Sequence, residues 1–350
     1  GPLVVELFCG CGGTSKGFEL AGYDIALGID IHEPSIRTFS KNHPNTIAML
    51  GDIKKITPES IKKLLSGRSI DVLIAGVPCQ GFSLNNRKRH SDDKRNFLYK
   101  EFIKYISILK PKIAILENVS GMMSTSNGDF VKNIESDIAE AGKMQVSSRL
   151  LLAADYGVPQ MRRRLVFIGI KNKLPFDFDK ELKKTHGPST NLPYTTIKDA
   201  ISDLSTISSG EESFKYRTSP NSTYQKMMRE KSPNTVFNHK APKHPTEVIN
   251  KIKNTEPGKP LYPKFKQRIR LAWNIQSPTQ VSGGIRPQFQ FGHPESNRGL
   301  TIRERCRIQS FPDDFIVEGG TVQGRVQTGN AVPPLLAKAI ALAVKKYLKK

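Results

Sequence analysis

The sequence has few cysteines, no long apolar run and a shortage of acidic residues. Its four cysteines are too sparse and too irregularly spaced for a disulfide framework, which favours a reducing compartment. Only one residue separates Cys9 from Cys11 and no second cysteine pair follows, so we expect no metal site. No segment approaches the length of a membrane span, and no basic region followed by an apolar stretch opens the chain. The sequence therefore predicts neither a membrane protein nor an exported one.

Because acidic residues are few, the chain is strongly basic. Against 54 lysines and arginines stand 32 aspartates and glutamates, a formal charge of +22 over 350 residues. Such a balance favours a polyanionic partner, bound through phosphate contacts and counterion release, and nucleic acid is the leading candidate. The alternative is a basic but solvated surface, to which we assign the lysine pairs at 62–63, 183–184 and 349–350.

Short apolar runs alternate with amphipathic stretches through the first half of the chain. Strands are predicted at 3–8, 25–30, 72–75, 112–116 and 165–170. Helices are predicted from 14 to 20, 34 to 41, 97 to 109 and 130 to 141. Strands that alternate with helices indicate an α/β fold with a doubly wound, mostly parallel sheet.

The composition changes after residue 171. The chain becomes rich in proline, serine, threonine, asparagine and lysine without a clean period, as a loop-rich recognition region does, while scattered aromatic residues argue against full disorder. Residues 333–348 read as an apolar-faced helix that packs back on the first domain. We therefore expect a catalytic and cofactor-binding domain at 1–171, completed by 325–350, and a smaller domain at 172–324.

The tetrapeptide Pro78-Cys79-Gln80-Gly81 follows the apolar run at 72–75. A strand that ends in glycine and proline and then presents a thiol has the layout of a nucleophile on a loop at a sheet edge. A lone cysteine is more often a small buried apolar residue, so Cys79 needs support from other residues.

A glycine-rich turn at 8–14 joins the first predicted strand to a helix. Its glycines allow a ligand to approach the backbone, and the helix N-terminus offers N–H groups to an anionic end. Asp30 ends the second strand, where an acid can accept both hydroxyls of a ribose, and Asp52 could pair with an adenine amino group or cap a helix. A dinucleotide fingerprint requires a third glycine where Ser15 stands. The three elements indicate a pocket for an adenosyl ligand that lacks a pyrophosphate.

Two further groups of charged residues follow. Glu117 ends the strand after the one that leads to Cys79, so a carboxyl group and a thiol meet at one sheet edge, where the acid can protonate a heterocycle that the sulfur attacks. On the extended segment that follows Gln160, Arg162 and Arg164 share one face and Arg163 takes the other. A plain basic strand and a phosphate contact remain alternatives for these arginines.

Taken in order, these motifs resemble those of the DNA cytosine-5 methyltransferases, of the bacterial restriction-modification type. The motifs are the Phe-x-Gly-x-Gly turn at 8–12, Pro-Cys-Gln at 78–80, Glu-Asn-Val at 117–119, Gln-x-Arg-x-Arg at 160–164, the stretch from Leu300 to Pro312, and Gly-Asn-Ala-Val-Pro-Pro at 329–334. The resemblance covers nearly all of the chain outside about 172–270. It implies a sheet of the S-adenosylmethionine-dependent methyltransferase type with a smaller, loop-rich target-recognition domain.

The resemblance also implies a role for each catalytic residue. Cys79 adds to carbon 6 of a cytosine that has been rotated out of the duplex, and the methyl group is transferred from S-adenosylmethionine to carbon 5. Glu117 contacts ring nitrogen 3 and the amino group, and Arg164 donates to the carbonyl oxygen. Arg162 supports the loop. The base that removes the carbon-5 proton is not identifiable from the sequence.

Binding residues follow from the same resemblance. S-adenosylmethionine, which becomes S-adenosylhomocysteine, is expected to contact Phe8, Gly10, Gly12, Asp30, Ile31, Asp52, Ile53, Pro78, Leu98 and Asn330. Double-stranded DNA is expected to contact Gln80, Ser83, Arg87, Lys88, Arg89, Arg268, Arg270 and Arg286, with Gln280 and Gln288 as further candidate base readers.

The main hypothesis is a sequence-specific DNA cytosine-5 methyltransferase that acts as a monomer in the bacterial cytoplasm, near the nucleoid, with a cognate restriction endonuclease as a functional partner. One alternative is a transfer-RNA cytosine-5 methyltransferase on the same scaffold, although the Cys-Phe-Thr tripeptide of that family is absent from the sequence. Another is a catalytically silent DNA-binding relative, which the intact Cys79, Glu117, Arg162 and Arg164 oppose.

Overall fold

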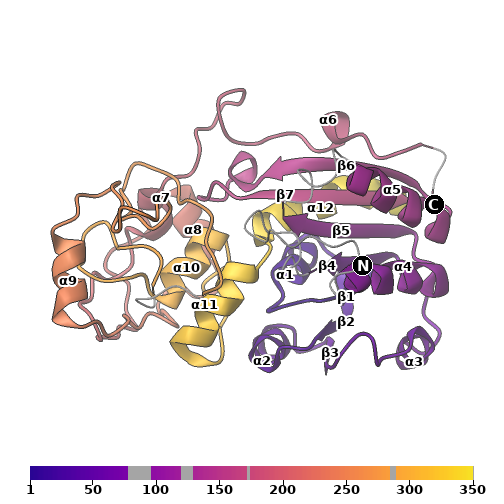
Figure 1. Cartoon of the computed structure of the whole chain (residues 1–350), viewed down its shortest axis with the longest axis horizontal. Helices are drawn as coiled ribbons and strands as arrows, with labels where there is room; N and C mark the ends of the chain where they lie inside the picture. Colours follow the sequence, from indigo (N-terminus) through magenta and orange to yellow (C-terminus); the bar gives the residue numbers. More distant parts are fainter. Residues whose placement is uncertain (78–95, 120–128, 172–173, 284–288, 350) are drawn as a thin grey trace. The chain divides into compact units, whose positions relative to one another are not determined.

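The computed structural model describes residues 1–77, 96–119, 129–171, 174–283 and 289–349 (Figure 1). The chain divides into two compact units: the first comprises Gly1–Leu152, Arg163–Lys183 and Ala337–Lys350, the second Ala153–Arg162 and Lys184–Leu336. These bounds differ from the sequence expectation in three places. Residues 172–183 belong to the first unit, although they were assigned to the smaller domain. Residues 153–162 and 325–336 belong to the second unit, although both were assigned to the catalytic domain.

A seven-stranded sheet forms the centre of the first unit, in the order β3-β2-β1-β4-β5-β7-β6. The strands are β1 (Leu3–Leu7), β2 (Asp24–Asp30), β3 (Ile47–Leu50), β4 (Val72–Gly76), β5 (Ile113–Val119), β6 (Gln145–Leu152) and β7 (Arg163–Ile170). The first five strands of this order, β3, β2, β1, β4 and β5, are parallel to their neighbours. Strand β7 is antiparallel to both β5 and β6. The predicted doubly wound, mostly parallel sheet is confirmed.

Helices follow most of these strands along the chain. They are α1 (Gly13–Leu20), α2 (Glu33–Asn42), α3 (Pro58–Leu64), α4 (Asn96–Leu109), α5 (Asp129–Gly142), α6 (Phe178–Glu181) and α12 (Pro334–Lys345), which runs across the boundary between the two units. The inner strands are apolar along their length because both faces of the sheet are covered: β1 and β4 contribute Val5, Leu7, Leu73 and Ala75 to the main core.

The C-terminal helix packs on the first unit, as the sequence predicts. The Tyr23 hydroxyl donates to the Ala341 carbonyl at 2.7 Å, and the Lys345 ammonium donates to the Ala21 carbonyl at 2.7 Å. Helix α12 ends at Lys345, and a short 3₁₀ turn continues to Leu348. The last residues of the chain therefore belong to the same unit as the first strand.

The second unit is built from short helices joined by loops. Its helices are α7 (Ile197–Ile201), α8 (Thr223–Arg229), α9 (Thr246–Lys253), α10 (Ile302–Gln309) and α11 (Gly320–Asn330). A core that includes Ile201, Leu271 and Ile308 lies between them, with Trp273, the single tryptophan of the chain, packed against it. The loop-rich texture predicted for this region is confirmed.

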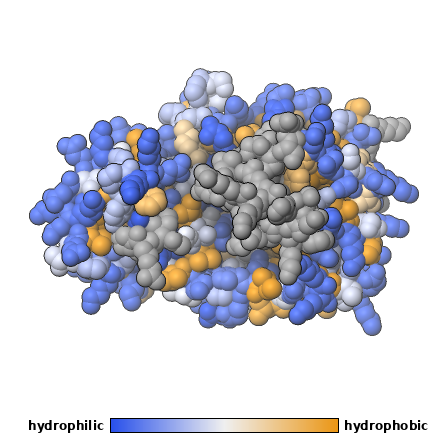
Figure 2. All heavy atoms as spheres, viewed as in Figure 1, coloured by the Kyte–Doolittle hydropathy of each residue, from blue (hydrophilic) through white to orange (hydrophobic). Residues whose placement is uncertain are grey.

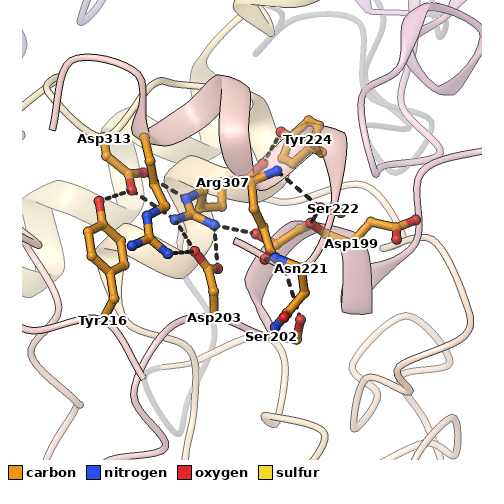
Figure 3. Close-up of polar contacts among 12 residues, drawn as sticks. Asp199, Ser202, Asp203, Tyr216, Asn221, Ser222, Tyr224, Arg307 and Asp313 are labelled. Atoms are coloured by element: carbon orange, nitrogen blue, oxygen red, sulfur yellow. Dashed lines mark hydrogen bonds and ion pairs between the residues drawn. The ribbon is translucent and has the colours of Figure 1, made fainter. Parts of the chain in front are cut away.

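A buried ion-pair network fixes helix α10 within the second unit (Figure 3). The Arg307 guanidinium donates to both carboxylate oxygens of Asp313 at 2.7 and 2.8 Å and to both of Asp203 at 2.8 and 3.1 Å. It also donates to the Ala200 carbonyl at 2.7 Å, so all five of its N–H groups are used. The Tyr216 hydroxyl adds a hydrogen bond to Asp313 at 2.6 Å. Such complete pairing is what a fully buried charge requires.

Hydrophilic residues cover most of the visible face in Figure 2, with apolar residues scattered among them. Within the described ranges, no helix combines the length and the apolar character that crossing a bilayer requires.

Candidate active site

The candidate active site lies at the edge of the sheet where the parallel strands β1, β2, β4 and β5 reach their carboxyl ends. In doubly wound sheets this edge is where ligands bind. Glu6 and the glycine-rich turn come from β1, Asp30 ends β2, and Gly76, at the end of β4, pairs with Glu117 on β5. The topology therefore gathers the acids singled out in the sequence at one edge.

The turn after β1 has a backbone that favours glycine. Phe8, Gly10 and Gly12 all have positive φ, at 54°, 55° and 100°. A Cβ on Gly12 would lie 2.9 Å from both the His43 ring and the Phe39 ring, so no side chain fits there. Gly12 is also the N-cap of α1, and the Lys16 amide donates to its carbonyl at 2.8 Å. The turn thus places the N-terminus of α1 at the sheet edge.

Gly10 borders open space and is tied to Asp30. A Cβ built on Gly10 would meet no atom of the described residues within 4 Å. The Gly10 amide donates to one Asp30 carboxylate oxygen at 2.8 Å, and the His32 amide donates to the other at 2.8 Å. Each oxygen keeps a second lone pair for a ligand hydroxyl. An open cradle beside an oriented carboxylate suits the ribose of an adenosyl ligand.

Sequence reasoning missed Glu6, which is 2% exposed beneath this turn. The Ser15 hydroxyl, in the first turn of α1, donates to the Glu6 carboxyl at 2.6 Å. Burial, supported by the charges of Asp30 and Glu117 and opposed by Ser15, raises the pKa of Glu6 to about 8. An acid near the end of an otherwise apolar strand, next to a glycine-rich turn, is the sequence signal that could have identified Glu6.

The remaining predicted cofactor contacts of the first unit differ in exposure. Ile31, directly after Asp30, is 69% exposed, as a residue that stacks against a ligand ring would be before binding. The Asp52 carboxylate accepts a hydrogen bond from the Lys54 amide at 3.0 Å and so caps a turn. Ile53 is buried in the main core, and Leu98 is partly buried against it.

Glu117 and Arg164 meet at the same edge. Arg164 Nε lies 3.2 Å from a Glu117 carboxylate oxygen, and the two side chains are 11% and 16% exposed. Antiparallel pairing of β5 with β7 brings them together, since Val119 lies opposite Arg164 in the register. Gly76 leaves room for the acid: a Cβ there would lie 3.2 Å from the Glu117 carboxylate. The pair places one hydrogen-bonding acid and one cation beside the end of β4.

Arg162 belongs to the second unit and is 1% exposed. Its guanidinium donates to the carbonyls of Gln280 and Gly329, both at 2.8 Å. Gln160, which sequence reasoning treated only as part of a motif, donates to the Gln309 amide oxygen at 2.9 Å within the same network. Arg162 therefore supports the backbone next to Asn330, an exposed residue at the end of α11.

Three predicted base readers are in the interior of the second unit, which corrects the expectation for them. Arg268 is 4% exposed and donates to the Phe289 carbonyl at 2.7 Å. Arg270 is 6% exposed and donates to the carbonyls of His293 and Ile252 at 2.9 and 3.0 Å. Gln280 is 1% exposed. Guanidinium groups that are buried against backbone carbonyls hold loops together and do not present their N–H groups to a base edge.

The other predicted contacts fall outside the described residues. These are Pro78, Cys79, Gln80, Ser83, Arg87, Lys88, Arg89, Arg286 and Gln288.

This fold and this edge define the class of the protein, a doubly wound α/β enzyme of the S-adenosylmethionine-dependent methyltransferase type. A family model described as C-5 cytosine-specific DNA methylase matches residues 3–346. The chain therefore belongs to the C-5 cytosine-specific DNA methylase family, and its activity is that of a DNA cytosine-5 methyltransferase.

Curated relatives align with this chain over nearly its whole length. The chain is 35% identical to the type II methyltransferase M.DdeI of Desulfomicrobium norvegicum, with 98% of this chain and 88% of the relative covered. It is 33% identical to the type II methyltransferase M1.HphI of Haemophilus parahaemolyticus, with 98% and 86% covered. The relatives favour DNA methylation over the transfer-RNA alternative.

Solved structures show the same architecture. An E. coli prophage-encoded protein described as a DNA modification methyltransferase superposes with a TM-score of 0.83 at 25% identity, with both chains fully covered. The Dnmt2 methyltransferase of S. pombe superposes with a TM-score of 0.63 at 14% identity over 99% of each chain, a likeness of fold alone.

Proposed function

We propose that Cys79 is the nucleophile of this methyltransferase, with Glu117 and Arg164 as the groups that activate the cytosine ring. The observation that carries the proposal is the Glu117–Arg164 pair, at 3.2 Å, beside the end of β4. Strand β4 leads directly into the Pro78-Cys79-Gln80 tripeptide. An acid and a cation at the exit of that strand are the groups that a thiol needs in order to add to a heterocycle.

Carbon 5 of cytosine is too weak a nucleophile to accept a methyl group directly. Cys79 loses its proton, and its sulfur forms a bond to carbon 6, which breaks the 5,6 double bond and turns the ring into an enamine. Glu117 donates a proton to ring nitrogen 3 and binds the amino group, and Arg164 donates to the carbonyl oxygen, so charge that develops on the ring is stabilised. After methylation, loss of the carbon-5 proton to a base and cleavage of the carbon–sulfur bond release Cys79.

S-adenosylmethionine, when bound, supplies the electrophilic methyl group. Its adenosine fits the edge between Gly10 and Asp30, where the carboxylate is oriented by two backbone amides. In this proposal Ile31 flanks the adenine, and Asp52 with Ile53 reads the adenine edge. Phe8, Gly12, Pro78, Leu98 and Asn330 complete the proposed pocket.

The substrate is double-stranded DNA with the target cytosine rotated into the site, at a cost of a few kcal/mol offset by protein contacts. Residues 81–95, with Ser83, Arg87, Lys88 and Arg89, carry the polarity and charge of a segment that closes on a duplex. Gln80 and Arg286 complete the proposed contacts. Bisulfite sequencing of a plasmid exposed to the enzyme identifies the recognition sequence and the methylated cytosine.

The decisive experiment replaces Cys79 by serine. We expect methylation to be abolished while the affinity for S-adenosylhomocysteine and the melting temperature stay at the parent's values. A duplex that carries 5-fluorocytosine at the target should become covalently trapped on the parent, in the presence of methyl donor, and not on the variant. Turnover within tenfold of the parent, or no trapping on the parent, would overturn the nucleophile assignment.

The type II names of the relatives support a role beside a cognate restriction endonuclease. We propose that the enzyme acts as a monomer in the bacterial cytoplasm, at the nucleoid. Sedimentation of the enzyme with a duplex that holds one target site tests the stoichiometry, and a mass of two chains per site would contradict it.

A further inference from the structure

Arg268 anchors an exposed loop of the second unit. Every residue from 263 to 267, with the sequence Pro-Lys-Phe-Lys-Gln, is exposed, whereas Leu261 and Arg268 on either side are 1% and 4% exposed. We call residues 263–267 the KFK loop. The contrast between a buried base and an exposed tip is the first observation to explain.

The base of the KFK loop is rigidly built. The Leu261 amide donates to the Arg268 carbonyl at 2.8 Å, and the Arg268 amide donates to the Phe265 carbonyl at 2.9 Å. The Arg268 guanidinium lies 4.5 Å from the centre of the Tyr262 ring. Leu261 belongs to a small apolar core with Ile252 of α9 (Figure 1). The loop is therefore held in a defined shape by its own core.

The tip carries an aromatic ring between two cations. Phe265 is 57% exposed, and Lys264 and Lys266 flank it in the sequence. Single exposed apolar residues are common on protein surfaces. A phenyl ring at the tip of an anchored turn, with a lysine on each side, is instead suited to a polyanion whose grooves offer apolar base edges such as the thymine methyl group.

The surroundings of the KFK loop have the same sign of charge. Between residues 251 and 267 the lysines are Lys251, Lys253, Lys259, Lys264 and Lys266, and the acid is Glu256. Lys251, in the last turn of α9, lies 5.3 Å from the centre of the Tyr262 ring, so the helix and the loop present their charges together. A lysine-rich stretch of this kind favours phosphate groups.

We infer that the KFK loop contacts the duplex, with Lys264 and Lys266 on phosphates and Phe265 against a base. The inference rests on the proposed function, because the duplex is its ligand. It assigns DNA contact to exposed residues of the second unit in place of the buried Arg268 and Arg270. Arg268 acts as a positioning residue for the loop and does not touch DNA.

Duplex binding at several salt concentrations tests the two lysines. We expect Lys264→Ala with Lys266→Ala to weaken binding of target and non-target duplexes alike and to lower the slope of log affinity against log salt by about 2. The matched control is Lys62→Ala with Lys63→Ala on α3, a pair of exposed lysines assigned to the solvated surface, which should keep the parent slope. An unchanged slope in the loop variant, or an equal loss in the control, would overturn the inference.

Phe265→Ala tests the ring. We expect the affinity for the target duplex to fall about tenfold with no change in salt slope, and Phe265→Tyr to keep most of it. Phe214, 56% exposed on another loop of the same unit, is the matched control, and Phe214→Ala should bind as the parent does. Equal affinities for Phe265→Ala and the parent would overturn the base contact.

Methylation by the parent enzyme separates the two hypotheses. A parent that transfers methyl groups to duplex DNA while all loop variants bind as it does would leave the proposed function standing and remove the loop from it. A parent that transfers no methyl group would remove the proposed function itself. Circular dichroism melting of each variant confirms that the chain is folded.

Discussion

In the first unit the buried Glu6 carboxyl has the charges of Asp30 and Glu117 nearby, whereas in the second unit the buried carboxylates of Asp203, Glu304 and Asp313 pair with guanidinium groups. At the sheet edge, burial and the charges of Asp30 and Glu117 raise the pKa of Glu6 to about 8. In the second unit, burial acts to raise the pKa of Asp313, but Arg307 outweighs it and the pKa lies below its ordinary value. Opposite shifts in two buried regions of one chain need an explanation.

This difference distinguishes a ligand-binding site from a structural scaffold. A fully paired network such as that of Arg307 leaves its charges satisfied, so it stabilises one arrangement of the loops and offers little to a ligand. Burial and the charges of Asp30 and Glu117 keep a proton on Glu6, and groups with a pKa perturbed in this way concentrate at functional sites.

The largest expected effect is on the scaffold. Arg307→Met leaves Asp313 and Asp203 buried without the guanidinium that contacts both, and should lower the free energy of unfolding of the second unit by about 3–5 kcal/mol. Urea unfolding followed by the fluorescence of Trp273, which packs in that unit, measures it.

The control for Arg307 is an exposed pair of the same chemistry. Arg149→Ala removes a contact to Asp179 in which the two side chains are 45% and 82% exposed, and should cost less than about 1 kcal/mol. A cost for Arg307→Met no larger than that of Arg149→Ala would contradict the view of the network as the scaffold of the second unit.

A substitution in the active site should lower turnover and leave the stability nearly unchanged. Glu117→Gln keeps the shape of the side chain but cannot protonate the ring, so turnover should fall by about 10²–10³ while the melting temperature stays within a few degrees of the parent. Methyl transfer from labelled donor and circular dichroism melting measure the two quantities. Destabilisation as large as that of Arg307→Met would make Glu117 part of the scaffold.

The sequence was sufficient to predict the inner strands and missed both outer ones. Strands β1, β2, β4, β5 and β7 are buried on both faces and so read as continuous apolar runs. The missed strands, β3 (Ile47–Leu50) and β6 (Gln145–Leu152), are the two edges of the sheet. Most of their residues are exposed or only partly buried. In β6, polar residues such as Ser148 interrupt the apolar run, and β3 is apolar but only four residues long.

The residues of the candidate site could likewise be predicted only in part. Strand order alone brings Asp30 and Glu117 to one edge, because parallel strands end together. Composition, however, does not distinguish a buried arginine from an exposed one. The arginines in the interior of the second unit are Arg162, Arg268, Arg270, Arg298, Arg303, Arg305 and Arg307. Part of the basic excess that pointed to DNA is therefore structural, and this is why Arg268 and Arg270 were misassigned.

The next effect depends on pH. With the pKa of Glu6 at about 8, against 4.5 in the unfolded chain, the folded protein keeps a proton that the unfolded chain loses. Stability is unaffected below about pH 4.5, falls by up to about 1.4 kcal/mol per pH unit as the pH rises toward 8, and levels off above it. Glu6→Gln, which is neutral at every pH, should remove this loss.

The difference between parent and Glu6→Gln is the quantity to measure, since other groups titrate equally in both. Circular dichroism melting from pH 5 to 9 should show the variant gaining on the parent as pH rises. Trp273 fluorescence should show no such gain for the second unit. Parallel profiles for the two proteins would mean that Glu6 is ionised in the fold and that the contrast between the units is absent.

The smallest effect concerns the hydroxyl that contacts Glu6. Ser15→Ala removes the hydrogen bond that opposes the rise in the Glu6 pKa, so stability near neutral pH should fall by about 1 kcal/mol and the pH at which the loss levels off should move upward. Ser107→Ala, which removes an exposed hydroxyl contact on α4, should change neither quantity. In a Glu6→Gln background the cost of Ser15→Ala should become independent of pH, because no proton remains to couple to it. A cost that still varies with pH in that background would assign the coupling to another acid of the edge.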